Sequence, residues 1–215
     1  MKIDLSVLSP AVQEKIYDDL LQGLTRNCGE ALAVLSEFIL SPLFLIKMAN
    51  RSHRLRLERA MQKLESRYKE IPTGERTQPP PEIAELVLEE VVKIDDERLS
   101  DMFIELLANA SLNSPERRVH RAFVGTLKEM VPDEALIVQD LRRNQFVPFI
   151  RFMGSEFLPF SDRLTGLEHR LALAVPDSLP FYLENLVRLG VLECIDDLIF
   201  EFSEQLYQNL LGRVF

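Results

Sequence analysis

The stretch LERAMQKLESRYKEI, residues 57–71, has the clearest pattern in the chain. Its apolar side chains are separated by four, three, four and three positions, and they are Leu57, Met61, Leu64, Tyr68 and Ile71. This spacing places them on one narrow face, so it predicts a long amphipathic helix with a coiled-coil type seam. Two coverings of the seam remain open: a neighbouring helix of the same chain, or a homodimer through Leu57, Met61, Leu64 and Tyr68.

The window before this helix, residues 31–49 (ALAVLSEFILSPLFLIKMA), is the most apolar in the chain. A bilayer span takes roughly 20 apolar residues, but Glu37, Lys47 and the central Pro42 oppose a constitutive span here. We expect a buried core helix, with contact to a membrane surface as the alternative.

Proline marks the other side of the seam. Residues 72–81 (PTGERTQPPP) contain three consecutive prolines, which favour an extended path and cannot lie inside a helix. We therefore expect a linker at 72–81, after an N-terminal helical region at 1–71. Residues 82–144 follow with helical spacing and with cap signals at Asp95 or Asp96, Ser114-Pro115 and Pro132. They predict a small helical bundle.

The pattern changes over residues 145–215. An expected helix after Asp177-Ser178 ends at Gly190, and two short apolar runs at 191–195 and 198–202 flank Asp196-Asp197. This order predicts a winged-helix-like α+β unit with a short β-hairpin. The expected fold class is therefore mainly α, with long N-terminal helices, a bundle and this C-terminal unit.

Charge is unevenly distributed along the 215 residues, whose formal net charge is −9 from 25 Lys+Arg and 34 Asp+Glu. Residues 47–76 hold nine basic and four acidic side chains, a balance of +5. Residues 82–105 hold nine acidic and two basic side chains, a balance of −7. Adjacent blocks of opposite sign indicate two helix faces that attract each other, or that attract a partner.

Nucleic-acid binding is disfavoured by this balance, because phosphate contacts need clustered Lys and Arg. Residues 177–204 would carry the recognition helix of a winged helix, yet they hold seven acidic side chains and only Arg188. An anionic partner, if there is one, is expected to contact the basic segment at Arg51, Arg54, Arg56 and Arg59.

No catalytic, cofactor or metal motif stands out. The three histidines have no HxxxH or HxH spacing, and the eight glycines form no phosphate-binding loop. Cys28 and Cys194 are far apart and match no disulfide framework. We expect a non-enzymatic cytoplasmic protein without cofactor or metal, with residues 31–49 as an alternative peripheral contact to the membrane.

Short motifs run in a fixed order through nearly the whole chain. They are Ile16-Tyr17-Asp18-Asp19-Leu20, Pro42-Leu43, Ile71-Pro72, Pro81 with Ile83 and Ala84, Leu99-xx-Met102-Phe103-xx-Leu106-Leu107-Ala108-xx-Ala110, Val119-His120-xx-Phe123-Val124-xx-Leu127-Lys128-xx-Val131-xx-Asp133-Glu134-Ala135, and Leu183-Glu184-Asn185-Leu186-xx-Leu189-Gly190-Val191. In this order they resemble the Abi-alpha (abortive-infection alpha) family, a bacterial domain family of unknown function.

The resemblance implies a mostly helical bacterial protein with a suspected role in phage defence and no established catalytic residues. His120, Phe123, Asp133 and Glu134 are motif residues of unknown role. Arg121 follows His120 where family members tend to have proline, so His120 has two interpretations: a ligand or pH-sensing site, or a histidine that bonds the backbone at a helix start.

Two functions follow as expectations. The first is an interaction or effector component of phage defence that binds a protein partner or perturbs a membrane. The second is a structural or regulatory adaptor with no defence role, in which the chain pairs with itself.

Overall fold

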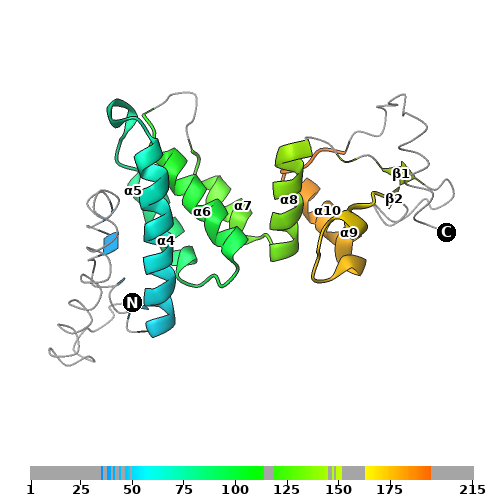
Figure 1. Ribbon diagram of the computed structural model, residues 1–215, viewed down its shortest axis with the longest axis horizontal. Helices are drawn as coiled ribbons and strands as arrows, with labels where there is room; N and C mark the ends of the chain where they lie inside the picture. Colours follow the sequence, from blue (N-terminus) through cyan, green and yellow to red (C-terminus); the bar gives the residue numbers. More distant parts are fainter. Residues whose placement is uncertain are drawn as a thin grey trace. The chain divides into compact units, whose positions relative to one another are not determined.

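The computed structural model describes residues 35, 38, 39, 41, 44, 47, 48, 50–113, 119–144, 147, 149–151 and 163–194. The chain divides into two compact units, Met1–Glu129 and Met130–Phe215. Among the described residues, helices make up nearly all the regular structure of both units (Figure 1). The expectation of a mainly helical protein is therefore confirmed.

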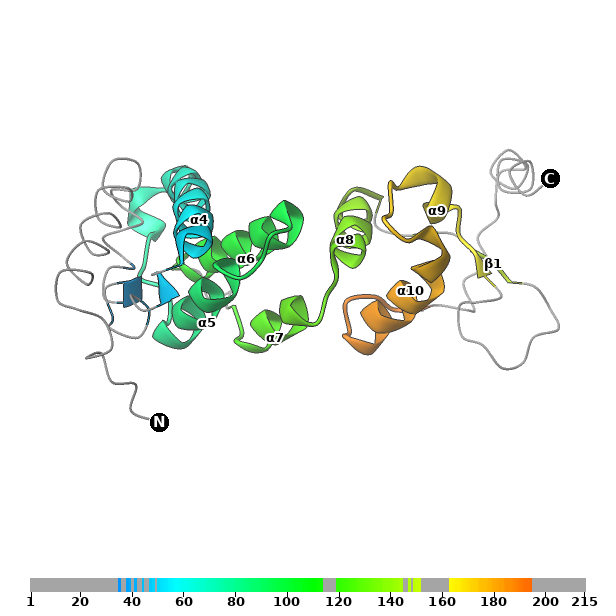
Figure 2. The same cartoon turned by 90° about the horizontal axis from the view of Figure 1, so that it is seen from below.

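The first unit is built around α4, Arg51–Glu70. Asn50 caps its start by accepting a hydrogen bond from the Ser52 N–H. Helices α5 (Pro81–Val91) and α6 (Glu97–Ala110) lie alongside α4, and the short α7 (Ala122–Lys128) packs on α5 and α6 (Figure 2).

The apolar stripe of α4 is buried by helices of its own chain. Leu57 and Met61 are 0% exposed, Leu64 is 3% exposed, and all three belong to one core with the inner faces of α5 and α6. Tyr68 and Ile71 continue the buried stripe toward the end of the helix. The sequence left open whether the seam packs against a neighbouring helix of the same chain or against a second copy. In this structure it packs against neighbouring helices of the same chain.

The apolar window at 31–49 contributes to the same core. Its described apolar side chains are nearly all buried in it, with Phe38 partly buried against it; the buried ones are Leu35, Ile39, Phe44 and Met48. No helix in the part of the chain that the structure describes is long and apolar enough to cross a membrane.

The Pro-rich segment connects two helices of one unit, because α4 and α5 share the core on either side of it. It folds back on the end of α6. Asn113 N–H donates to the Glu75 carbonyl (2.8 Å), and Thr77 N–H donates to the Ser111 carbonyl (2.9 Å). The Arg76 guanidinium lies 5.2 Å from the centre of the Tyr68 ring, within cation–π range. The first unit ends at Glu129.

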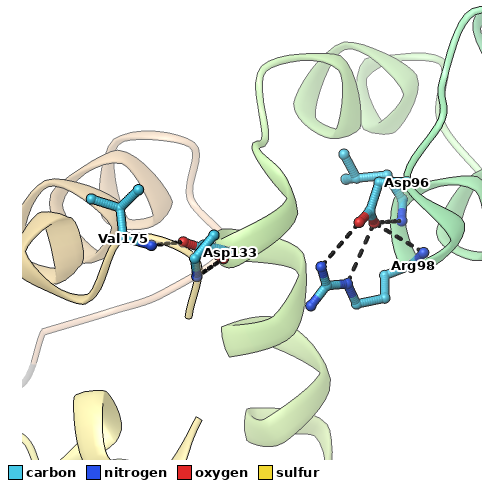
Figure 3. A network of polar contacts seen from close by, with 6 residues as sticks. Asp96, Arg98, Asp133 and Val175 are labelled. Atoms are coloured by element: carbon cyan, nitrogen blue, oxygen red, sulfur yellow. Dashed lines mark hydrogen bonds and ion pairs between the residues drawn. The ribbon is translucent and has the colours of Figure 1, made fainter. Parts of the chain in front are cut away.

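Asp96 is the N-cap of α6, one of the two positions expected for that cap. Its carboxylate accepts from the backbone N–H of Arg98 (3.0 Å) and of Leu99 (3.1 Å), and from the Arg98 guanidinium (Figure 3). Burial alone would raise the pKa of Asp96, but these donors outweigh it and lower the pKa. The carboxylate is therefore held ionised at the positive end of the helix dipole.

The second unit contains α8 (Pro132–Asn144), a two-residue antiparallel pair formed by β1 (Ile150–Arg151) and β2 (Arg163–Leu164), α9 (Leu167–Arg170), the 3-10 turn η4 (Pro176–Ser178) and α10 (Leu179–Arg188). As expected, Gly190 terminates α10 as the residue after the C-cap Leu189, and its φ of 69° is a conformation that favours glycine, which has no Cβ. The Val191 N–H donates to the Leu186 carbonyl (2.9 Å) and closes this turn.

The winged-helix and hairpin expectations find no support in the described residues. The first expected strand, 191–195, has no strand over residues 191–194, because the Val191 and Leu192 N–H groups are used in the turn that ends α10. The remainder, including the second expected strand at 198–202, lies outside the described residues. The helix expected from Ser114-Pro115 is also shorter, since residues 119 and 120 are not helical and α7 begins at Ala122.

The buried seam gives a first prediction. Leu64→Asp places a carboxylate with no partner in the core, and we expect it to lower the free energy of unfolding by about 3 to 5 kcal/mol. Chemical denaturation measures this loss. Ser66→Asp, on the exposed face of the same helix, is the matched control and should change stability by less than about 0.5 kcal/mol. Equal stability of Leu64→Asp and the parent would contradict the burial of the seam.

Candidate functional site

The four arginines of the expected anionic-partner patch, Arg51, Arg54, Arg56 and Arg59, all lie on α4. Arg56 is engaged within the chain: its Nε donates to Asp95 (2.8 Å), a second nitrogen pairs with the same carboxylate, and a third donates to the Val92 carbonyl (3.0 Å). Arg51 and Arg59 are exposed and form no ion pair with a residue that the structure describes. The expected patch therefore has at least one of its four cations committed to the fold.

The basic segment meets the acidic segment in a row of ion pairs. Three pairs connect α4 to the start and the outer face of α6, and a fourth connects the preceding segment to α5; they are Arg56–Asp95, Lys63–Asp101, Arg67–Glu105 and Lys47–Glu89. The +5 and −7 blocks of the sequence thus attract each other, one of the two interpretations that the charge pattern allowed. Glu90 of α5 also pairs with Lys93 (2.9 Å) and with Lys128 at the end of α7 (3.0 Å), so it connects α5 to α7.

Several members of this row are well exposed, which limits its contribution to stability. The side chains of Lys63 and Asp101 are 39% and 50% exposed, and exposed pairs typically contribute 0 to about 1 kcal/mol. The core supplies most of the stability of the first unit. The ion pairs add a smaller, salt-dependent contribution between α4 and α6.

Charge reversal tests this row of pairs. Lys63→Glu places a second carboxylate beside Asp101, and we expect a loss of about 0.5 to 1 kcal/mol in unfolding free energy at low salt. Adding Asp101→Lys should restore most of the loss, because it reforms the pair with reversed polarity. Arg59→Glu, which has no described ion pair, is the control for net charge. If the double variant is no more stable than Lys63→Glu, the pair does not contribute.

The histidine of the family motif lies at the start of α7. His120 is exposed, and its Nδ1 accepts a hydrogen bond from the Ala122 N–H (3.1 Å). This is the contact that the helix-start interpretation predicts. Phe123, one turn further along, is 50% exposed, although it is a large apolar side chain.

Asp133 and Glu134 of the motif are buried in the second unit, with 4% and 2% of their surface exposed. The Asp133 carboxylate accepts from the backbone N–H of Val175 (3.0 Å), as Figure 3 shows, and from that of Ala174 (2.9 Å). It therefore fixes the segment before α10 to the first turn of α8. Both acids lie in the first turn of α8.

Glu134 connects two motifs that are 51 positions apart in the sequence. Its Oε2 accepts from the Val131 N–H (2.9 Å), and its Oε1 accepts from the Asn185 side-chain amide (2.9 Å). The first contact is the backbone half of a capping box. Asn185 in turn accepts from the Arg188 guanidinium through its side-chain oxygen. One glutamate thus caps α8 and holds α10 against it.

Tyr182 completes this cluster. Burial raises the pKa of its hydroxyl, and the hydrogen bond to Asp133 together with the negative charge of Asp133 raises it further. The neutral hydroxyl therefore remains a donor to Asp133. The sequence placed Asn185 in a family motif without assigning it a role, and it gave no indication of Tyr182; the helical phase of 182 and 185 on α10 was the only available signal.

The cluster of Asp133, Glu134, Tyr182 and Asn185 uses its polar groups to hold α8, α10 and the preceding segment together. Each carboxylate accepts at least two hydrogen bonds. Within the described residues, no group of three or more His, Cys, Asp or Glu side chains could hold a metal ion. Chemically, the arrangement is suited to fixing backbone segments.

Substitution of Asp133 tests this assignment. Asparagine has one acceptor oxygen, so Asp133→Asn leaves one of the two N–H groups at 174 and 175 without its acceptor and weakens the Tyr182 contact. We expect a loss of about 1 to 3 kcal/mol, and faster hydrogen exchange at these two amides. Asp177→Asn, an exposed neighbour, is the matched control. Unchanged exchange in Asp133→Asn would show that the carboxylate does not hold the segment.

Among known families, the family model described as Abortive infection alpha matches residues 52–212 of the chain. No curated protein and no solved structure matches the chain. The match includes the seam residues of α4, the ion pairs of Arg56, Lys63 and Arg67, and the buried carboxylate cluster, whereas Lys47 lies before it.

Proposed function

The chain belongs to the abortive infection alpha family, and we propose that it is a non-enzymatic component of bacterial phage defence that acts by binding another protein. The family match over residues 52–212 is the observation that carries this proposal. It relates the protein to abortive infection. The burial and contacts of individual residues support protein binding as its mode of action.

The use of the motif carboxylates supports binding over catalysis. Asp133 and Glu134 are buried and bonded to backbone and side-chain N–H groups. A general acid or base must reach a substrate proton, whereas these two groups face the interior. The motif acids therefore build the second unit, and the surfaces of the protein are left to carry its activity.

Phe123 supports a protein partner. It is an aromatic motif residue with 50% of its surface exposed, and Val131 of the same motif is 42% exposed. A single exposed apolar residue is common in soluble proteins, but aromatic side chains are enriched where proteins contact each other. An aromatic ring that belongs to the motif and does not enter the core is a candidate contact residue.

The burial of the apolar window favours a protein partner over a membrane. Leu35, Ile39 and Met48 are at most 1% exposed, so they would have to leave the core before meeting lipid. That exchange would expose the seam of α4 to water. Membrane perturbation would therefore require the first unit to open.

Phage challenge tests the proposed function. We expect bacteria that express the protein to yield fewer phage, and Phe123→Ala to lose this protection without loss of thermal stability. Leu55→Ala, which removes a 44% exposed apolar side chain outside the family motif, should keep protection. Unaffected growth and phage yield with the parent protein would contradict the defence role and favour the adaptor function.

A further inference from the structure

A groove of about 120 Å³ opens between α5 and the preceding segment at residues 38–44. It combines two aromatic rings, two carboxylates and one hydroxyl around an apolar floor, and its lining consists of Phe38, Ser41, Phe44, Glu85, Leu88 and Glu89. All of these residues belong to the first unit. The groove uses none of the motif residues discussed above.

The local chain path builds the aromatic side of this groove. Ser41 N–H donates to the Phe38 carbonyl (3.1 Å), and Phe44 N–H donates to the Ser41 carbonyl (3.0 Å). These two bonds form a turn that brings both phenyl rings to the same side of α5. Phe44 is 6% exposed and anchored in the core, while Phe38 is only partly buried.

The opposite side of the groove is acidic. Glu85 and Glu89 are four positions apart on α5, so they lie on one face of the helix, with the buried Leu88 at the floor. Lys47 pairs with Glu89. Glu85 is exposed and forms no ion pair with a residue that the structure describes. The fold thus supplies one cation for two carboxylates, and it leaves a negative charge beside two rings.

We propose that this groove binds the guanidinium group of an arginine side chain from a partner protein. The negative faces of phenyl rings attract cations, and a carboxylate adds a directed, charge-assisted hydrogen bond. Arginine fits this combination best because its planar group stacks on rings and is less strongly hydrated than the ammonium of lysine. An anionic group is repelled by Glu85.

The size of the groove agrees with this ligand. A volume of about 120 Å³ has room for several water molecules or for one planar cationic group, and it is too small for a helix or a drug-sized molecule. The groove would therefore receive one side chain as part of a larger protein contact. This inference deepens the proposed partner-binding function by naming the chemistry that the partner presents.

The test uses the full-length protein labelled with ¹⁵N and titrated with N-acetyl-L-arginine amide, followed by NMR. We expect chemical-shift changes centred on residues 38–44 and 85–89. N-acetyl-L-norleucine amide, which is uncharged, should give weaker changes. Phe38→Leu keeps the apolar volume but removes one ring, and we expect it to weaken arginine binding.

Glu85→Gln and Glu82→Gln form a matched pair, because both remove one exposed carboxylate from α5 and only residue 85 lines the groove. We expect Glu85→Gln to weaken binding of the arginine probe by about fivefold and Glu82→Gln to leave it within about twofold. If both variants lost the same amount of affinity for the arginine probe, the loss would reflect net charge alone, and the proposal would be overturned.

Three further results would also overturn it: no shift changes with the arginine probe, equal binding of the norleucine probe, or tighter binding of tetramethylammonium, which would point to a small organic cation instead of a protein. Concentration-dependent shifts of the same groove without any probe would identify a second copy of the chain as the occupant. Loss of phage protection is scored separately, so failure of the groove and failure of the defence role are distinguishable.

Discussion

The apolar stripe of α4 is the constraint on which the first unit depends. A helix of 20 residues with one narrow apolar face is not stable alone in water and must cover that face. Here α5 and α6 cover it, and the described side chains of the apolar window close the same core. The Pro-rich segment returns the chain from the end of α4 to the start of α5 and is pinned to the end of α6.

Charge follows from this packing. Once α4 lies on α6, its basic side chains run beside the acidic ones of the following segment, and Arg56, Lys63 and Arg67 each find a carboxylate. The core supplies most of the stabilisation, and the partly exposed ion pairs add a smaller contribution. A consequence for function is that an anionic partner would have to compete with the carboxylates of the chain itself for part of this basic segment.

The second unit is organised by buried carboxylates. Asp133 and Glu134 at the start of α8 hold α10 and the segment before it, so the two separated stretches that resemble family motifs meet at one place through Asn185. A place in a family motif therefore does not by itself give Asp133 or Glu134 a catalytic role. In this protein the motif acids maintain the fold of the second unit, and we propose the half-exposed Phe123 and the Phe38–Glu85 groove as recognition features.

Local patterns predicted the individual helices well. The seam of α4, the cap at Asp96, the proline start of α8 and the end of α10 at Gly190 each depend on neighbours within a few positions, so the sequence contains the whole signal. Long-range contacts were less accessible. Neither the return of the Pro-rich segment to α6 nor the Glu134–Asn185 bond has a local signal, because each joins groups that are tens of positions apart.

We infer that the α4 seam is buried by helices of its own chain and not by a second copy. Hydrogen exchange tests this directly, because it measures the protection of the α4 amides. We predict that the amides of α4 around Leu57, Met61 and Leu64 are strongly protected and that their protection is the same across a wide range of protein concentration, since α5 and α6 of the same chain cover them. Protection of α4 that develops only as concentration rises would contradict the intrachain core and show that a second copy covers the seam.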